Sequence, residues 1–295
     1  MEPLREHIFE DRLMGSDLVV SIVMSSPDMA RKEYERAKSL GNDYEKRFSR
    51  FLPTSELSRL NDTGVADVSS EFIDVISTGF SLYRDTHGAF NPLVQIARMG
   101  YDTSFDTLNG PREIDHGNYD VHPTSVSIDE VSRHIVLGTG QRLDVGGYLK
   151  GMVAEHMAKS IEGADGIIVN IGGDIYTTGK DENGAPFGFD VYDPVNEQVA
   201  VVVPLTDGAI ATSGVYRRAW EADGKRVHHI LDETGTQNPT SDLVSATIIA
   251  EHGHEADAYA TVAIVMGSER ASRLLRERGL SYVFITHEGK TIMNI

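Results

Sequence analysis

The feature that most constrains this fold is the order along the chain of two patterns of apolar residues, one typical of strands and one typical of helices. Apolar residues alternate with other residues over 187–191 and 199–205, which is the pattern of β-strands. Over 30–48 they recur every three or four positions, which is the pattern of a helix. Strand patterns are many, and helix patterns are mixed among them without strict alternation. The sequence therefore favours an α+β fold over a doubly wound α/β sheet.

The N-terminal part predicts a strand, two helices and a long loop. A β-rich run over 18–24 is followed by Ser26-Pro27, a helix cap with proline at the first helical position, and then a helix to about residue 48. Residues 52–61 are polar and contain a proline, so we expect a connector there. A second helix should begin near Ser70 and stop before Thr86. Residues 99–123 have no periodicity and predict a long surface loop.

The rest of the chain predicts further strands and three helices. We expect short strands at 126–128 and 135–137, a helix from 149, a strand at 166–175 interrupted by paired glycines, strands at 187–191 and 199–205, a hairpin at 218–230, a strand at 243–250, helices at 255–266 and 268–275, and a terminal hairpin about 288–289. No internal repeat, low-complexity segment or clear linker is visible, so we expect residues 1–295 to form a single domain.

Charge and composition exclude several classes of function. With 27 Lys and Arg against 45 Asp and Glu, the formal net charge is −18, so the surface as a whole repels nucleic acid and anionic membranes. An anionic ligand would therefore need local positive groups or a metal. The chain has no cysteine, which excludes disulfides and cysteine nucleophiles. No run reaches the length of a membrane span and the N-terminus is charged, so we expect a cytoplasmic protein unless an export signal has been trimmed.

The stretch Leu143-Asp-Val-Gly-Gly-Tyr-Leu-Lys-Gly151 predicts a turn that leads into a helix. Glycines at a helix start allow a ligand to approach the backbone, and the exposed amides favour an anion. Lys150 adds a positive charge beside them. The spacing matches neither a P-loop nor a dinucleotide-binding glycine motif. Two interpretations stay open at this point: a phosphate-facing turn, or an ordinary strand–turn–helix joint with a surface lysine.

Asp257 and Thr261 are four residues apart in the helix expected at 255–266, so they share one face of it. Their carboxylate and hydroxyl oxygens are ligands that suit Mg²⁺, which binds one or two protein oxygens together with substrate phosphates. The alternative is an aspartate that favours the helix dipole in the first turn and a threonine that faces the core.

Three further segments carry polar groups that could act on a ligand. His228-His229, followed by Asp232, offers a general base near neutral pH, or else a strand with one histidine inward and one outward. Gly172-Gly-Asp174 could bring the backbone close to a ligand or could form a turn or bulge. The hydroxyls and amides of Ala211-Thr-Ser-Gly214 could line a phosphate site or cap a turn.

Taken together and in order, these segments resemble the ApbE family of flavin transferases. The resemblance covers nearly the whole chain and is carried by Met14-Gly-Ser16, Phe48-Ser-Arg-Phe51, residues 55–61, Gly88-Ala-Phe-Asn91, residues 144–151, residues 169–174, residues 211–214, residues 229–232, residues 256–263 and Met266-Gly267.

The resemblance implies an α+β fold of mixed, mostly antiparallel sheets, with flanking helices around a central flavin-binding cleft. It implies that Mg²⁺ is held by Asp257, Thr261 and the carbonyl of Gly147. His229 is our candidate for the general base. The residues expected to bind the flavin dinucleotide are Met14, Phe51, Ala89, Phe90, Asn91, Asp144, Lys150, Ser213 and Ile230.

The resemblance also implies an activity. FAD would be the substrate, and its FMN part would be transferred onto a Ser or Thr hydroxyl of an acceptor protein, with release of AMP. Metal and Lys150 would offset the charge of the pyrophosphate while the base takes the proton of the hydroxyl.

The chain departs from the family pattern at four places. Asn91 stands where the family usually has Asp, Phe51 where it has Tyr, and Glu155 where it has Asp. The loop after Asp232 is one residue shorter than the family's Pro-x-Thr-Gly. These changes keep two alternatives open: an FAD pyrophosphatase that yields FMN and AMP, and a non-catalytic flavin-binding protein.

Overall fold

The structure is a computed structural model that describes residues 3–101, 112–115, 117 and 120–295. In chain order, the described residues form β1 (Arg5–Leu13), β2 (Ser16–Met24), α1 (Pro27–Phe48), α2 (Glu56–Thr63), β3 (Val65–Asp67), α3 (Ser70–Asp85), η1 (Ile96–Met99), η3 (Pro123–Ser125), β4 (Ser127–Asp129), β5 (His134–Val136), α4 (Leu149–Ser160), β6 (Gly166–Ile171), β7 (Asp174–Gly179), β8 (Phe187–Asp193), β9 (Gln198–Leu205), β10 (Gly208–Gly214), β11 (Ala219–Ala222), β12 (Lys225–His228), β13 (Leu243–Ala250), α5 (Gly253–Met266), α6 (Ser268–Glu277), β14 (Ser281–Thr286) and β15 (Thr291–Asn294).

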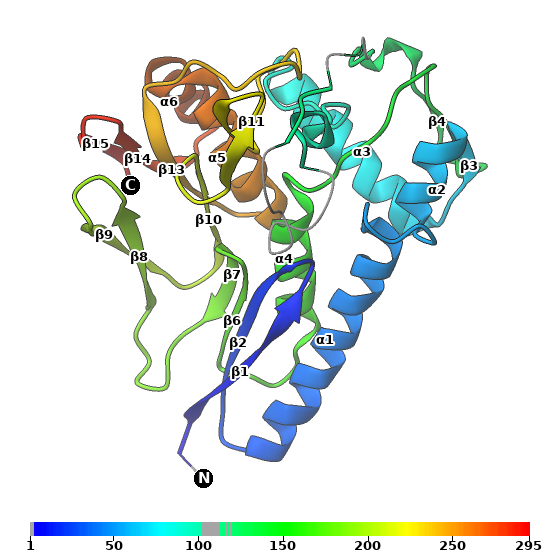
Figure 1. The fold of residues 1–295 in the computed structure, drawn as a ribbon. Helices are drawn as coiled ribbons and strands as arrows, with labels where there is room; N and C mark the ends of the chain where they lie inside the picture. Colours follow the sequence, from blue (N-terminus) through cyan, green and yellow to red (C-terminus); the bar gives the residue numbers. More distant parts are fainter. Residues whose placement is uncertain (1–2, 102–111, 116, 118–119) are drawn as a thin grey trace.

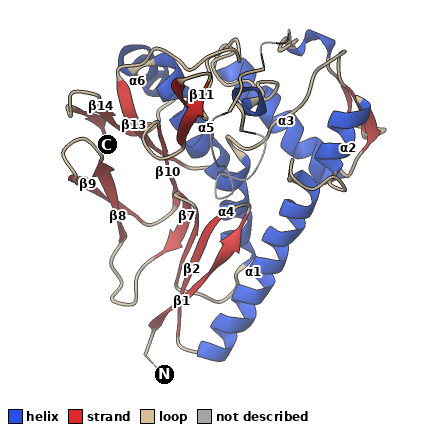
Figure 2. Cartoon of the chain, viewed as in Figure 1, coloured by secondary structure: helices blue, strands red, loops and turns tan. Residues whose placement is uncertain are grey.

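The largest sheet has eight strands in the order β1-β2-β6-β7-β10-β13-β14-β15, and its neighbouring strands are antiparallel (Figure 1). In the part of the chain that the structure describes, three smaller antiparallel sheets accompany it, with strand orders β3-β5-β4, β8-β9 and β11-β12. Helices and strands are mixed along the chain in the way that Figure 2 shows. The predicted α+β class with mostly antiparallel sheets is confirmed.

The two faces of the large sheet are covered by different elements. Ala209 and Ala211 of β10 belong to the main core, which the sheet shares with α1, α4 and α5, whereas Ile210 between them faces away from that core. Ile210 packs in a second cluster with Val23 of β2, Val283 of β14 and the inner side of the β8–β9 hairpin. Alternation along each strand therefore supplies both cores, as expected for a sheet buried on both faces.

Local signals in the sequence account for several elements that were predicted correctly. The Ser26 hydroxyl accepts a hydrogen bond from the Met29 N–H at 3.3 Å, and Pro27 opens α1 as predicted. Asp223 and Gly224 have φ values of 49° and 68°, which give the tight turn between β11 and β12. The strand predicted at 243–250 matches β13.

The connector predicted at 52–61 is wrong, because residues 56–63 form α2. The Ser55 hydroxyl caps this helix by accepting a hydrogen bond from the Ser58 N–H at 2.9 Å. Leu57 and Leu60 are buried, and Gly64 ends the helix with a φ of 73°. The polar composition concealed a short amphipathic helix whose two leucines reach the core.

The strand β1 was not expected, because most of its residues are charged and exposed. All nine of its residues pair with β2 in an antiparallel ladder, and Phe9 stacks on Tyr34 of α1 with ring centroids 4.5 Å apart. The turn between the two strands brings Met14 to the site described below. The loop predicted at 99–123 falls partly on residues 102–111, 116 and 118–119, which lie outside the described residues.

No helix in the described part of the chain is both long enough and apolar enough to cross a membrane.

Candidate active site

A cavity of about 1360 Å³ opens beside the start of α4. Its walls come from the β1–β2 turn, the end of α1 and the loop after it, the segment 89–91, the β6–β7 turn, β8, β10, α5 and the segments around β11 and β12. Every residue expected from the sequence to hold ligand, base or metal lines this cavity: Met14, Phe51, Ala89, Phe90, Asn91, Asp144, Gly147, Lys150, Ser213, His229, Ile230, Asp257 and Thr261.

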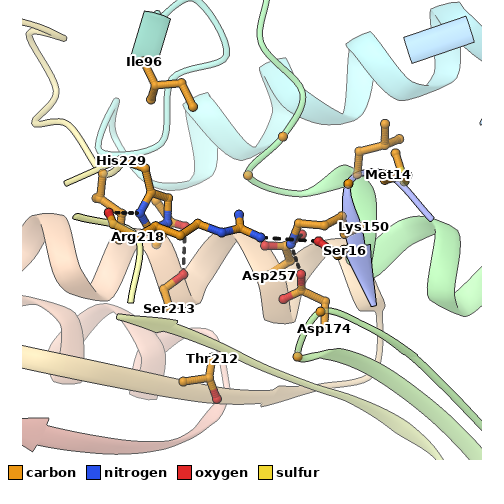
Figure 3. A pocket seen from close by; sticks show the side chains of 18 of the residues that line it. Met14, Ser16, Ile96, Lys150, Asp174, Thr212, Ser213, Arg218, His229 and Asp257 are labelled. Atoms are coloured by element: carbon orange, nitrogen blue, oxygen red, sulfur yellow. Dashed lines mark hydrogen bonds and ion pairs between the residues drawn. The ribbon is translucent and has the colours of Figure 1, made fainter. Parts of the chain in front are cut away.

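Lys150 stands in the first turn of α4 and points into the cavity (Figure 3). Its ammonium group forms an ion pair with Asp174, the first residue after the glycine turn between β6 and β7. Burial lowers the pKa of Lys150, and the nearby Asp257 carboxylate opposes that shift. The glycine pair at 172–173 thus forms the turn that brings Asp174 to the lysine, with φ values of 66° and 103°.

Asp257 and Thr261 face the cavity from one side of α5, as their spacing predicted. The Gly151 N–H donates a hydrogen bond to Asp257 Oδ2 at 3.2 Å. The Thr261 hydroxyl lies 3.1 Å from the hydroxyl of Ser213 on β10. Carboxylate and hydroxyl oxygens from two elements therefore meet at one place in the wall.

These oxygens fit a hard divalent cation. Asp257 is only 4% exposed, and burial raises the pKa of its carboxyl, so its anionic form needs a positive charge nearby. Lys150 Nζ lies 3.9 Å away and is already paired with Asp174. No group of three or more His, Cys, Asp or Glu side chains among the described residues could hold a metal ion. A cation here would take one carboxylate and neutral oxygens from the protein, and waters or substrate phosphates would complete its ligands, which suits Mg²⁺.

His229 follows β12 and lies against the segment that precedes β11. Its Nδ1 is 3.4 Å from the carbonyl oxygen of Arg218. Because a carbonyl only accepts, Nδ1 carries the hydrogen and Nε2 keeps a lone pair. Burial, together with the positive charge of Arg218, lowers the pKa of His229 to about 3. The imidazole is therefore neutral near pH 7 and able to accept a proton at Nε2.

Arg218 was not predicted, although it extends into the middle of the cavity. Figure 3 shows its side chain reaching from the His229 side toward Lys150 and Asp257. Its Nη2 donates to the Ser16 hydroxyl at 3.4 Å, and it forms no ion pair with any residue that the structure describes. In a protein with a net charge of −18, a cavity arginine without a carboxylate partner is suited to an anionic ligand.

Aromatic side chains and a further arginine form another wall of the cavity. The Arg50 guanidinium lies 4.7 Å from the ring centre of Phe51 and 4.9 Å from that of Tyr101. Its Nη1 is 3.5 Å from Asp144 Oδ2, a buried oxygen that accepts no hydrogen bond from the described residues. Phe51 is 46% exposed, so a planar ligand can reach its face.

Sequence reasoning missed Arg50, Tyr101 and Arg218, and it gave Asp174 no role as a partner of Lys150. Arg218 carried the most usable signal, because it follows the 211–214 segment closely in a chain with few basic residues. Asn91 lines the cavity, but both ends of its amide are hydrogen-bonded to backbone groups. Its Nδ2 donates to the Val121 carbonyl at 2.9 Å, and its Oδ1 accepts from the Leu93 N–H at 3.0 Å.

Comparison with known proteins agrees with this arrangement. A model of the ApbE family matches residues 14–284. An FAD:protein FMN transferase of Klebsiella pneumoniae (strain 342) is 30% identical over 300 residues, which cover 96% of this chain and 85% of the relative. One of Escherichia coli (strain K12) is 27% identical over 307 residues, which cover 98% and 88%.

Solved structures show the same fold. An ApbE protein of Thermotoga maritima has a TM-score of 0.86 at 26% identity, with 98% of this chain and 97% of that chain covered. The apo flavinyl transferase ApbE of Pseudomonas stutzeri has a TM-score of 0.83 at 20% identity, with 99% and 95% covered. Together with the family match over residues 14–284, these likenesses show that the chain belongs to the ApbE family.

Proposed function

We propose that this protein transfers FMN from FAD to a Ser or Thr hydroxyl of an acceptor protein, with release of AMP and with Mg²⁺ as cofactor. The names of the relatives support FMN transfer from FAD to protein. One observation carries the proposal for this chain. A neutral base, His229, and Arg218, which forms no ion pair with the described residues, lie in one cavity with the oxygens of Asp257 and Thr261.

The charged groups beside the candidate metal ligands balance one another. Lys150 and Arg218 are offset by Asp174 and Asp257, and His229 is neutral. A divalent cation and the two negative charges of a pyrophosphate would then enter together without a net change in charge. Among buried groups such as these, this matching matters more than on a surface, because an uncompensated buried charge is costly.

The proposed reaction transfers the whole FMN group by substitution at its phosphorus atom. The acceptor hydroxyl oxygen forms a bond to the phosphorus on the FMN side of the pyrophosphate, and the bond from that phosphorus to the bridging oxygen breaks, so AMP leaves with the bridging oxygen. The hydroxyl proton goes to Nε2 of His229, while the Arg218 carbonyl holds the hydrogen on Nδ1. Arg218 offsets negative charge on the phosphoryl oxygens.

Asp257, Thr261 and the Gly147 carbonyl would hold Mg²⁺, which supplies charge neutralisation at the pyrophosphate oxygens. Positioning and charge account for most of the catalysis in such transfers, and the protein has little covalent work to do. We assign the rings of Phe51 and Phe90 to apolar contact with the flavin dinucleotide, and Asp144 Oδ2 to a hydrogen bond from one of its N–H or O–H groups.

The test is an incubation with FAD and Mg²⁺, with and without an acceptor protein of a relative. We expect AMP to form only with the acceptor, and the acceptor to gain the mass of FMN. AMP and FMN formed equally well without any acceptor would instead support an FAD pyrophosphatase. Binding of FAD with no AMP under either condition would support a non-catalytic flavin-binding protein. In the transfer case, Asp257→Ala should remove the activity without loss of the fold.

A further inference from the structure

The two helices that carry the candidate metal and phosphate groups cross through a pair of glycines. A Cβ atom at Gly151 of α4 would overlap the carbonyl of Gly253 of α5, and a Cβ atom at Gly253 would overlap the carbonyl of Gly151. The two backbones are therefore in direct contact. Glycine is required on both sides, because any side chain would force the helices apart.

Each helix accepts a backbone hydrogen bond from the other at this crossing. The Gly151 N–H of α4 donates to Asp257 Oδ2 of α5 at 3.2 Å. In the opposite direction, the Gly253 N–H of α5 donates to Glu155 Oε2 of α4 at 2.8 Å. Glu155 is thus the counterpart of Asp257 in a reciprocal pair of amide–carboxylate bonds.

Glu155 is held firmly where it stands. It is 5% exposed, and its Oε1 lies 2.5 Å from Lys159 Nζ and 3.1 Å from Nδ1 of His252. Burial by itself would raise the pKa of Glu155, but the hydrogen bonds from Lys159, Gly253 and His252 outweigh burial and lower it. The carboxylate is therefore charged near neutral pH and cannot leave its partners without losing several hydrogen bonds.

The N-terminus of α5 depends on this carboxylate. The cap residue His252 makes no side-chain hydrogen bond to the first amides of the helix, so Glu155 supplies an acceptor from the neighbouring helix instead. Asp257 lies one turn beyond Gly253, and Thr261 one turn further, on the same helix. By fixing Gly253, Glu155 therefore determines the positions of the Asp257 carboxylate and the Thr261 hydroxyl relative to α4.

We propose that Glu155 is a positioning residue for the metal ligands. It touches neither the cavity nor a ligand group, but it fixes the first turn of α5 on α4 and so sets the distance from Asp257 and Thr261 to Gly147 and Lys150. This inference rests on the proposed function, which assigns Asp257, Thr261 and Gly147 as the metal ligands. A purely structural role would lower the stability of the protein and leave the affinity for the cation unchanged.

The test measures Mn²⁺ binding by calorimetry at pH 7.5 without FAD. Outer-shell changes typically weaken metal binding by about 10- to 100-fold, and we expect Glu155→Gln to raise the dissociation constant about tenfold. The matched control is Glu255→Gln, which removes the same charge in the first turn of the same helix from a residue outside the reciprocal pair. It should leave the dissociation constant within about twofold.

A wild-type dissociation constant in Glu155→Gln would overturn the inference, even if its melting temperature falls. If that variant does not fold, Glu155→Asp decides, because it keeps the charge and withdraws the oxygens by one methylene. We expect several-fold weaker Mn²⁺ binding, and unchanged binding would contradict the proposal. A wild-type protein that binds no Mn²⁺ would overturn the metal set and this inference together. If Glu155→Gln weakens Mn²⁺ binding as expected but the wild-type protein transfers no FMN, only the proposed function would be overturned.

Discussion

The pKa of His229 yields the sharpest prediction, because it separates this site from one with an ordinary histidine. Burial and Arg218 lower that pKa to about 3 from the usual 6.5. At pH 5.5, a histidine of pKa 6.5 would be about 90% protonated, whereas one of pKa 3 would be protonated to well under 1%. Lowering the pH from 7.5 to 5.5 should therefore leave the free enzyme's base intact, where an ordinary histidine would cost about tenfold in kcat/KM.

The assay is the initial rate of AMP release at saturating Mg²⁺ and acceptor, with FAD well below KM, across pH 5 to 9. We expect no loss of kcat/KM with a midpoint near pH 6.5. His229→Gln should lower kcat by about 100-fold or more, because a positioned general base contributes about 10²- to 10⁴-fold. A decrease in kcat/KM at low pH with a midpoint near pH 6.5, absent from His229→Gln, would refute the prediction that the imidazole is buried and neutral. Wild-type kcat in His229→Gln would refute its role as base.

The remaining predictions concern charge and stability. Arg218→Gln should raise the KM for FAD about tenfold or more, since a hydrogen bond to a charged group contributes about 1.5–3 kcal/mol; an unchanged KM would count against its contact with the pyrophosphate. Asp257→Asn should abolish Mg²⁺-dependent AMP release yet melt in EDTA at the wild-type temperature or above it, because burial already disfavours its charge. Lys150→Met should lower the free energy of unfolding by about 3–5 kcal/mol in denaturant titrations, since it leaves Asp174 buried without its partner. Because the pKa of His229 is lowered in the folded protein, only the unfolded chain binds a proton at this residue between about pH 6.5 and 3. The free energy of unfolding should therefore decrease as the pH is lowered through that window, by at most about 1.4 kcal/mol per pH unit. The free energy of unfolding of His229→Gln should depend less steeply on pH. Equal slopes in the variant and the wild type would show that His229 is not the cause.

Local chemistry in the sequence was sufficient for those parts of the fold that depend on local signals. The cap at Ser26 and the turn at 223–224 are decided within a few residues, and both were predicted. The strand β1 was not, because its charged residues are held by a ladder with β2 rather than by burial of their own side chains. The helix α2 was not, because its two buried leucines are hidden among polar residues.

The candidate site was predictable only to the extent that its residues fell in recognisable segments. Asp257 and Thr261 could be placed on one helix face from their spacing alone. That Lys150 would meet Asp174 could not, because it depends on how the β6–β7 turn stands against α4. Arg218 was missed because its role depends on its place in the cavity and on its having no ion pair with the residues that the structure describes, which no spacing in the sequence encodes.

The contact between α4 and α5 was the least accessible part. Gly151 and Gly253 lie far apart in the chain, and each glycine alone fits an ordinary turn or helix start. Only the packed structure shows that the two backbones touch there. It also shows that Asp257 of α5 accepts a hydrogen bond from an N–H of α4, and that Glu155 of α4 accepts one from an N–H of α5. The sequence marked Glu155 only as a departure from the family pattern.

One measurement tests the central claim most directly: the ratio of AMP released to FMN bound covalently to the acceptor in a single turnover of FAD. The account predicts one AMP for each acceptor that gains FMN, with neither product in Asp257→Ala. AMP released together with free FMN, on an acceptor whose mass is unchanged, would contradict it.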